Sequence, residues 1–588
     1  MRVALAAMLA LAGCLEVPKP KGQECAVDSD CNTAIGEVCG DGVCWGGPPA
    51  GTYAATLSAP VERQDVIATE LPLVELPRGG NLGALELETP VTISGRVEAA
   101  CGPIQMNCST SSIAARIRIT RPSRFPGGPT LRFLALSKSG VPRGTDSFTI
   151  RVPRTGPDDP PYTVTIDPEG GGDAPPPHGG KDPAQLVPPK RFELAAAESI
   201  EHQTYTLGTN AVQISGTLKD SLGASLTKYR VVAVGRWQGS SNTAELSSVH
   251  YSTDGTYSIS LAEGVTGTVE LVAKPYDMQV APELHVTGVE PTGPQTRNIF
   301  QPTGIGARID VSIPIEGLSG NGEVRPVSGA RVIVTGSTAS TFTSSARAVV
   351  VAEAITMDDG IARFSLLDGD ALAGSYRLRV VPPASSSFGV IYDQPLQLGA
   401  LTKVRLPSRI AVRGSVVDIA GLPLADVSVT ARRSLRFLWS LDAPDQAFLD
   451  EIPAATAITP ESGEFVMWLD PAIGSVWGHY DLFFETPDNS PSPSWSIADL
   501  EIPRIPGQMT ISLATVTIPD AAHMRGRVVD GAGIPVAGSA LRIFQISDNE
   551  SLCGEVSYAP AGCAADARAM GHGESDGTGM VRFTLPRP

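Results

Sequence analysis

Apolar and polar residues alternate along most of this chain, in short stretches separated by turns rich in glycine and proline. Residues 427–431, VSVTA, are typical, with an apolar side chain at every second position. A period of two places successive side chains on opposite faces of a strand, so one face of each stretch is predicted to be buried. Helical periodicity is almost absent. The pattern predicts a mainly β protein built of antiparallel β-sandwiches.

Three stretches open a repeated unit with the same elements, a strand, a tight turn and a second strand. They lie at 214–235, 412–433 and 524–544, and weaker copies occur at 93–102 and 321–336. In each clear copy the turn has Asp first and Gly fourth, the preference of a type I turn in which the Asp side chain accepts hydrogen bonds from the following backbone. The pairs are Asp220 and Gly223, Asp418 and Gly421, and Asp530 and Gly533.

Two more kinds of strand recur after the openers. The first comes after a glycine-led turn, and the next ends in or near proline. The glycine-led strands are predicted at 253–261, 358–367, 461–469 and 575–585, and the proline-tipped strands at 162–168, 268–275, 376–383 and 480–487. Short strands that recur with turns between them are typical of tandem sandwiches of about 100 residues.

The repeated strings resemble carboxypeptidase regulatory-like domains. The family pattern, G-x-V-x-D-x-x-G-x-P-[VLI]-x-x-A-x-V followed by DGxF or DGxY, fits well at 414–429 and 526–541 and partly at 216–231 and 322–334. At 95–100 only the opening Gly-x-Val remains. The resemblance implies Ig-like, transthyretin-like sandwiches. It also implies accessory modules rather than an activity, and some members belong to carbohydrate-binding-like superfamilies.

The repeats divide the chain into five predicted β-sandwiches. Their ranges are 50–205, 206–302, 303–407, 408–516 and 517–588. The first is enlarged by a Pro/Gly-rich stretch at 170–180, which we expect to be a solvated loop. The last ends directly after its glycine-led strand and has no proline-tipped strand. Either that sandwich is incomplete, or an earlier segment of the chain supplies the partner strand.

The N-terminus has the pattern of an export signal. Arg2 is followed by an apolar run at 3–12, which is too short to span a bilayer but fits the h-region of a signal peptide. The run ends in LAGC, residues 11–14, which resembles the lipobox of bacterial lipoproteins. The resemblance implies that signal peptidase II cuts before Cys14 and that the thiol carries diacylglycerol. The alternative is an ordinary signal peptide with a cysteine nearby by chance.

The lipobox divides the N-terminal region into a signal peptide at 1–13, a lipidated tether at 14–24 and a Cys-rich module at 25–48. Several acyl chains on one cysteine would hold the protein in a membrane far more firmly than one chain does. Leu15 follows Cys14 in place of the Asp that resembles an inner-membrane retention signal in some bacteria. This favours the outer membrane or cell surface over the inner membrane.

The cysteine count agrees with export. The chain has nine cysteines, and setting Cys14 aside leaves an even number, which suits disulfides in an oxidising compartment. The module spacing C-x5-C-x7-C-x4-C favours disulfides over the rival zinc site, which would need paired CxxC knuckles. The predicted half-cystines are Cys25, Cys31, Cys39 and Cys44, whose pairing stays open, and the pairs Cys101 with Cys108 and Cys553 with Cys563.

Charge and motifs exclude several function classes. The net charge of −17 without clustered Lys and Arg argues against nucleic-acid binding. The seven histidines form no HExxH motif, and neither a G-x-S-x-G elbow nor a Walker loop occurs. We therefore expect no enzyme, no metal and no cofactor.

Tryptophans concentrate in the fourth unit, and one of them breaks the strand pattern. In the glycine-led strand, Phe465, Met467 and Leu469 are predicted to face inward, so Trp468 takes a position that is polar in the other copies. It could stack on a sugar or anchor a partner. It could instead pack beneath the insertion at 433–453. The candidate ligand-binding residues are Trp439, Trp468 and Trp477.

Together these patterns predict an exported lipoprotein that displays β-sandwiches as a surface scaffold, adhesin or binding protein. Its expected partners are a membrane, through the lipid on Cys14, and a surface protein or glycan. The alternative is a carbohydrate-binding lipoprotein that uses exposed aromatic residues of the fourth unit. An enzyme accessory subunit is a third hypothesis.

Overall fold

Strands dominate the computed structural model, and its only helices in the described residues are the short 3-10 turns η1 (Asp28–Asp30) and η2 (Thr33–Ile35). The predicted fold class is confirmed: the protein is mainly β, with tandem antiparallel sandwiches after a disulfide-rich N-terminal module. The structure describes residues 25–100, 112–169, 186–238, 240, 243–276, 281–318, 323–339, 346–398, 403–434, 452–473, 476–487, 490–503, 509–548 and 565–587.

Sandwich 4 shows the common plan. One sheet has the order β33-β30-β37, with β38 also on β30, and the facing sheet is built on β31 and β35 with β32, β34 and β36 at its sides. The last strands, β37 and β38, run parallel to the opener β30. The strands are β30 (Ile410–Val417), β31 (Ser428–Arg433), β32 (Ala455–Ile458), β33 (Glu464–Leu469), β34 (Ala472–Ile473), β35 (Val476–Glu485), β36 (Trp495–Ile502), β37 (Thr510–Ser512) and β38 (Val516–Thr517).

The inward register predicted for sandwich 4 is confirmed. Phe465, Met467 and Leu469 of β33 are buried and pack against Val429 of β31 and Leu482 of β35. Alternate residues of each strand therefore fill the space between the two sheets.

Sandwiches 1 and 2 follow the same plan. In sandwich 1 the closing strand β12 runs parallel to the opener β6, and in sandwich 2 β20 and β21 run parallel to β13. Sandwich 1 comprises β6 (Val91–Ala99), β7 (Ala115–Arg121), β8 (Leu131–Ser137), β9 (Phe148–Val152), β10 (Tyr162–Pro168), β11 (Lys190–Leu194) and β12 (Ile200–Leu207). Sandwich 2 comprises β13 (Val212–Lys219), β14 (Tyr229–Trp237), β15 (Thr243–Glu245), β16 (His250–Ser252), β17 (Thr256–Leu261), β18 (Val265–Pro275), β19 (Glu283–Val289), β20 (Gln295–Thr296) and β21 (Ile299–Phe300).

In sandwich 3 the opener strand is not the one that the motif match predicts. Its opener is β22, whereas the partial motif match at 322–334 lies beyond that strand, because Glu316 of β22 pairs with Pro326 inside the matched stretch. The closing strand β29 again runs parallel to the opener. The strands are β22 (Arg308–Leu318), β23 (Val324–Pro326), β24 (Arg331–Ser337), β25 (Arg347–Ile355), β26 (Ile361–Leu367), β27 (Arg377–Val381), β28 (Ile391–Pro395) and β29 (Val404–Leu406).

The opener turns form as the sequence predicts. The amide of each fourth-position glycine donates to the carbonyl of its Asp, at 3.2 Å for Gly223, 3.0 Å for Gly421 and 2.8 Å for Gly533. The Asp carboxylates accept further backbone hydrogen bonds, for example from Leu422 to Asp418 at 2.8 Å. The turn joins the two sheets in each of these sandwiches.

Sandwich 5 is assembled from both ends of the described chain. β39 and β40 form its opener, and β3 pairs antiparallel with β40 while β5 runs parallel to β39. These are the places that β35 and the closing strands take in sandwich 4, so an earlier segment supplies the missing strands. The strands are β3 (Thr52–Leu57), β4 (Thr69–Val74), β5 (Asn81–Glu86), β39 (Ala521–Val529), β40 (Ala540–Asp548), β41 (Ala565–Glu574) and β42 (Met580–Pro586).

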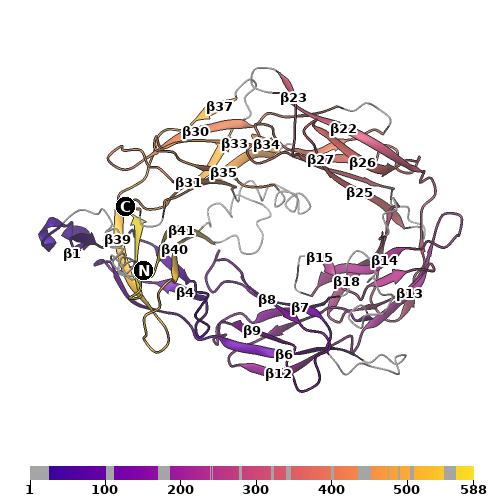
Figure 1. Ribbon diagram of the computed structural model, residues 1–588, viewed down its shortest axis with the longest axis horizontal. Coiled ribbons are helices and arrows are strands. Elements are labelled where there is room, and N and C mark those ends of the chain that lie inside the picture. The colour runs from indigo at the N-terminus through magenta and orange to yellow at the C-terminus, as the bar shows by residue number, and fades with distance from the viewer. Residues whose placement is uncertain are drawn as a thin grey trace, which may run out of the picture.

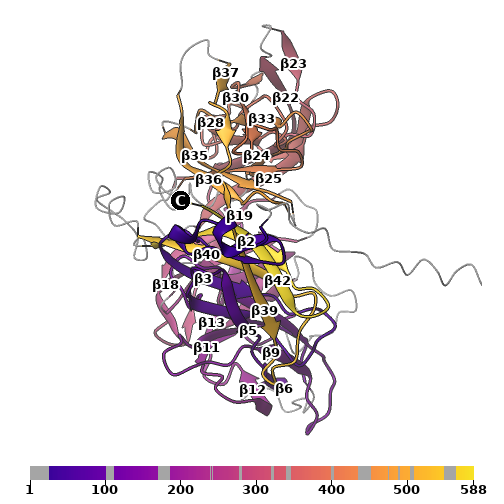
Figure 2. The same ribbon diagram turned by 90° about the vertical axis from the view of Figure 1, so that its left-hand side faces the viewer.

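This pairing corrects two predicted boundaries. Residues 52–86 belong to sandwich 5, so sandwich 1 does not begin at residue 50, and sandwich 5 is not confined to 517–588. The physical reason is burial, since Leu57 and Leu85 lie in one core with Met524 and Leu541. Figure 2 shows the indigo strands β3 and β5 beside the yellow strands β39, β40 and β42.

The sandwiches follow one another around a closed ring (Figure 1). Sandwiches 2 and 3 share one sheet, because β19 pairs with β25. At the junction of sandwiches 3 and 4, the buried Arg409 pairs with Asp470 at 3.3 Å and donates to the carbonyl of Pro383 in sandwich 3 at 3.1 Å. Between sandwiches 5 and 1, Arg121 is buried against Glu70 at 3.1 Å. Charged pairs taken out of water need close geometry and further hydrogen bonds, so these contacts define how neighbouring sandwiches meet.

A search of the described residues for a helix long and apolar enough to cross a membrane finds none.

Candidate functional site

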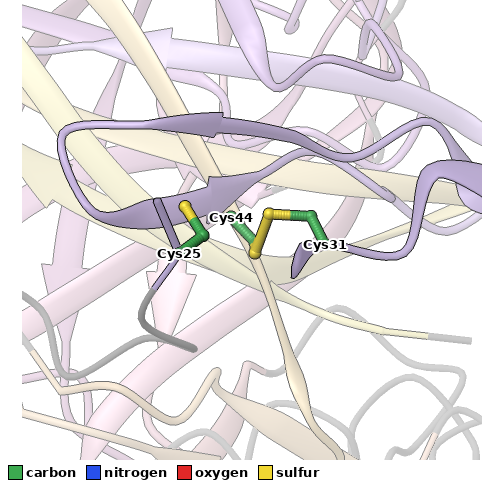
Figure 3. Close-up of side chains that lie close together, drawn as sticks. All are labelled: Cys25, Cys31 and Cys44. Carbon is green, nitrogen blue, oxygen red and sulfur yellow. A yellow bond between two sulfur atoms is a disulfide. The ribbon is translucent and has the colours of Figure 1, made fainter. Parts of the chain in front are cut away.

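The Cys-rich module is held by two disulfides. Cys25 pairs with Cys39 and Cys31 with Cys44, across separations of 14 and 13 residues. Figure 3 shows Cys25, Cys31 and Cys44 side by side. Their sulfur atoms lie within 4.8 Å of one another. Sulfurs bonded to each other are not thiolates, and a thiolate is what binds zinc. The module is therefore disulfide-linked, and β1 (Val38–Gly40) and β2 (Val43–Trp45) form its hairpin.

The module packs onto the closing sandwich. Trp45 is 2% exposed and lies under the guanidinium of Arg525, whose carbon is 4.9 Å from the ring centroid. Arg525 also donates to Asp41 of the module at 3.1 Å. Burial lowers the pKa of the neighbouring His523, so its ring stays neutral against Trp45. These contacts place the module on the opener β39, at the outer edge of the ring (Figure 1).

Trp468 is partly buried. It lies in β33 opposite Ala411 and lines a small space of about 20 Å³ together with Arg409 and Pro453. A space of that size suits one water molecule and is too small for a sugar ring. The backbone of Trp477 lies in β35 opposite Ala472.

A larger cavity of about 330 Å³ lies between sandwiches 4 and 5. Its walls come from β31, β35 and β36 on one side and from β40 and β41 on the other. The lining residues are Ser428, Thr430, Arg432, Arg433, Asp481, Phe483, Phe484, Glu485, Ser494, Trp495, Arg542, Phe544, Ala567, Arg568, Ala569, Gly571 and His572. This volume is within the range of small-molecule sites.

Strand alternation explains why these side chains face the cavity. Val429 and Ala431 point into the core of sandwich 4, so Thr430 and Arg432 lie on the other face of β31. In β40, Leu541 and Ile543 likewise fill the core of sandwich 5, and the residues between and after them face out. The cavity is therefore enclosed by the outer faces of two sheets that the ring brings together.

Arginines outnumber carboxylates on the cavity wall. Among the described lining residues there are four arginines, Arg432, Arg433, Arg542 and Arg568, and two acids, Asp481 and Glu485, in a chain whose net charge is −17. The guanidinium of Arg432 lies over the ring of Phe483, 5.0 Å from its centroid. In the described part of the chain, neither Arg432 nor Arg542 has a carboxylate at ion-pair distance. Arginine side chains therefore concentrate on the described wall of this cavity.

Phe544 links the cavity to a second junction. Its ring packs against Phe125 of sandwich 1, with centroids 5.5 Å apart. The same part of sandwich 1 holds Arg121, which pairs with Glu70 of sandwich 5. Sandwich 1 therefore packs against the strand of sandwich 5 that carries Phe544.

The predicted site residues have different outcomes. Six of them lie outside the described residues. These are the predicted lipidation site Cys14, the predicted half-cystines Cys101, Cys108, Cys553 and Cys563, and the candidate ligand-binding residue Trp439. Trp468 lines the small space beside Arg409 and not the cavity between sandwiches 4 and 5. Sequence reasoning missed Arg432, Phe483, Trp495, Arg542 and Phe544. The alternating SVTAR string at 428–432 marks an outward face, but nothing in it tells which other face it meets.

Comparison with known proteins finds no family model that matches this chain and no match among curated proteins. Several solved structures are similar at low identity. The shaft pilin spaA from Lactobacillus rhamnosus GG is 11% identical, with a TM-score of 0.19, and the match covers 36% of this chain and 98% of the pilin.

Two further structures are similar to this chain. The Bacillus anthracis TIE protein is 10% identical over 73% of this chain and 74% of its own, with a TM-score of 0.14. GBS52, the minor pilin of Streptococcus agalactiae, is 14% identical over 36% of this chain and 96% of its own, with a TM-score of 0.19.

Proposed function

We propose that this chain is an exported lipoprotein that holds a ring of β-sandwiches at a membrane surface as a scaffold. The disulfides Cys25–Cys39 and Cys31–Cys44 carry the proposal, because disulfides persist in compartments outside the cytosol. They follow the LAGC string that ends in Cys14, after the tether at 15–24. The resemblance of the repeats to carboxypeptidase regulatory-like accessory modules supports a scaffold rather than a catalyst.

The position of the module supports this anchoring. Arg587, near the end of sandwich 5, pairs with Glu37 of the module and with Asp520. A lipid on Cys14 would therefore be linked, through the tether at 15–24, to the part of the ring where both ends of the described chain meet. Pulling on the tether would load two disulfides and a packed sheet rather than a loose terminus.

The test is fatty-acid labelling of the full chain in a bacterial host, followed by membrane fractionation and mass spectrometry of Cys14. The wild type should carry label and sediment with the outer membrane, whereas Cys14→Ala should lose both. Cys39→Ser is the control, since it breaks a module disulfide and should keep the label. A Cys14→Ala variant that remains labelled and membrane-bound would contradict the proposal.

A second function, glycan binding, is favoured by the aromatic residues of the cavity between sandwiches 4 and 5. Trp495, Phe483 and Phe544 line it, and such rings stack on the apolar faces of sugars. A glycan array probed with the full chain would test this. Binding that is lost in Trp495→Ala would place the site in this cavity, and binding that is lost only in Trp468→Ala would place it on β33.

A further inference from the structure

We infer that the cavity between sandwiches 4 and 5 binds an acidic saccharide, a sugar ring that carries a carboxylate. This inference rests on the glycan binding proposed above and names the class of glycan. Arginines, carboxylates, hydroxyls and aromatic rings line one cavity of about 330 Å³. Each of these groups matches a different part of such a ligand.

The arginines match the carboxylate. Arg432 enters the cavity from β31 of sandwich 4 and Arg542 from β40 of sandwich 5, so the two cations approach from opposite walls. Neither has a carboxylate partner in the described part of the chain. A guanidinium presents its donors in a planar fork that fits a carboxylate with two parallel hydrogen bonds. An anion in the cavity would supply the missing partner.

The acids argue for a saccharide over a simple anion. Asp481 and Glu485 lie on the same wall as Phe483, and their repulsion disfavours ligands with several negative charges, such as inorganic phosphate or a nucleic-acid backbone, more than a ligand with one carboxylate. They are good acceptors for hydroxyl donors, of which a sugar ring has several. Ser428 and Ser494 add neutral hydroxyls. In a polyhydroxylated ligand with a single negative group, the hydroxyls can donate to the carboxylates of the wall and the negative group can accept from its arginines.

The aromatic rings match the apolar face of a sugar. Trp495 and Phe483 come from neighbouring strands of sandwich 4, and Phe544 faces them from sandwich 5. The guanidinium of Arg432 covers one face of the Phe483 ring, so Trp495 and Phe544 are the rings on which the sugar would stack. The volume is at the low end of the range of small-molecule sites, which suits one or two sugar rings.

Calorimetric titration of the full chain in detergent tests the inference. The probes are a glucuronate-containing oligosaccharide, a neutral oligosaccharide of the same length, and inorganic phosphate. We expect the acidic oligosaccharide alone to bind. Arg432→Gln and Arg542→Gln should each weaken binding about tenfold or more, as expected for loss of a charge-assisted hydrogen bond. Trp495→Ala should weaken it as well, and Trp495→Phe should restore part of the loss.

Arg325→Gln is the matched control, because Arg325 is an exposed arginine of sandwich 3 that pairs with Glu323. Equal binding of the neutral oligosaccharide would leave glycan binding standing and overturn the acidic class. Binding of phosphate with equal affinity would overturn the saccharide. Failure of every saccharide to bind would overturn both this inference and the proposed glycan binding. Binding unchanged in both arginine variants would overturn the assignment to this cavity.

Discussion

A buried hydroxyl recurs at one position of the repeat in sandwiches 3, 4 and 5, where it links two of the connections between the sheets. In sandwich 4 the hydroxyl of Thr459 donates to the carbonyl of Leu424 at 2.7 Å and accepts from the amide of Val427 at 2.9 Å. Thr356 and Ser575 make the same pair of bonds in sandwiches 3 and 5. Each side chain therefore satisfies backbone groups that the opener turn would otherwise leave buried and unpaired.

Thr459→Val should destabilise sandwich 4 by about 1–3 kcal/mol, because it leaves a buried amide and a buried carbonyl without partners. Thr459→Ser should cost much less, since the hydroxyl remains. Hydrogen exchange of the β31 amides measures the local opening free energy. Thr456→Val, at an exposed site on β32, serves as the control. Equal protection in Thr459→Val and wild type would count against this role.

A second repeated position, shortly before the second strand of each of four openers, adopts a left-handed backbone conformation both where it is glycine and where it is not. Its φ is 72° at Gly329 and Gly538, but also 65° at Lys228 and 58° at Asp426. The repeat requires this conformation because the residue's amide donates to the strand before the glycine-led turn, for example from Lys228 to Ser252 at 2.8 Å. A side chain with a Cβ is strained there.

Lys228→Gly should therefore stabilise sandwich 2 by up to about 1 kcal/mol, because glycine adopts positive φ without the Cβ clash. Lys219→Gly is the comparison, since the same substitution within strand β13 should destabilise by about 0.5–1 kcal/mol. Urea unfolding followed by hydrogen exchange of β14 gives both values. Destabilisation in Lys228→Gly would show that the lysine side chain contributes more than its strain costs.

At the scale of elements, a charged cluster lies on the sheet shared by sandwiches 2 and 3. His285 of β19 is flanked by Glu270 of β18 at 3.0 Å and by Glu283 at 3.4 Å, and Arg347 of β25 approaches Glu270 at 3.5 Å. Lys274 lies 3.9 Å from Glu283. Burial alone would lower the pKa of His285, but hydrogen bonds to the two carboxylates raise it to about 9.

Stability from this cluster should depend on pH with a defined sign. A folded pKa above the unfolded value means that protonated His285 stabilises the fold fully below about pH 6.5, and that this contribution is lost as the pH rises through 9. The free-energy difference between wild type and His285→Gln should therefore shrink between pH 7 and 10. A constant difference for His285→Gln would contradict the assignment.

Most elements of the repeats could be predicted from the sequence, because their signals are local. The Asp-to-Gly turns and the inward register of β33 depend on residues a few positions apart. The role of β3 as a proline-tipped strand also has a local signal in the sequence, because the strand ends three residues before Pro60. Its partner β40 lies at the other end of the chain, and no short-range pattern indicates that pairing.

The candidate cavity was not predictable for a related reason. The face of β31 that carries Arg432 reads in the sequence as an ordinary solvated face. It becomes a cavity wall only because sandwich 5, completed by residues 52–86, packs opposite it. The aromatic residue that the sequence singles out most clearly, Trp468, lies on a different sheet.

At the scale of the whole molecule, the ring depends on the strands at 52–86. A chain lacking 25–88 should lose hydrogen-exchange protection in β39 to β42, because β3 and β5 supply their partners and Tyr53, Leu57 and Leu85 fill their core. Sandwiches 2 and 3 should keep their protection. Adding a peptide of residues 50–88 in trans should restore sandwich 5.

A chain lacking only 25–48 is the control for that deletion, since it removes the disulfide module and keeps β3, β4 and β5. It should retain protection in β40, which pairs with β3. Full protection of sandwich 5 in the longer deletion would mean that these strands are dispensable.

The closure also sets the order of folding. Arg63 meets Asp530 across 467 positions of the chain, and bringing such distant segments together costs on the order of 5 kcal/mol of loop entropy. Sandwiches 2, 3 and 4 need only nearby strands and can fold first, which shortens the distance left to close. During vectorial synthesis residues 52–86 are made early and must wait, unpaired, for β39 and β40. We therefore expect completion of sandwich 5 to be the last step of folding, after sandwiches 2, 3 and 4 have formed.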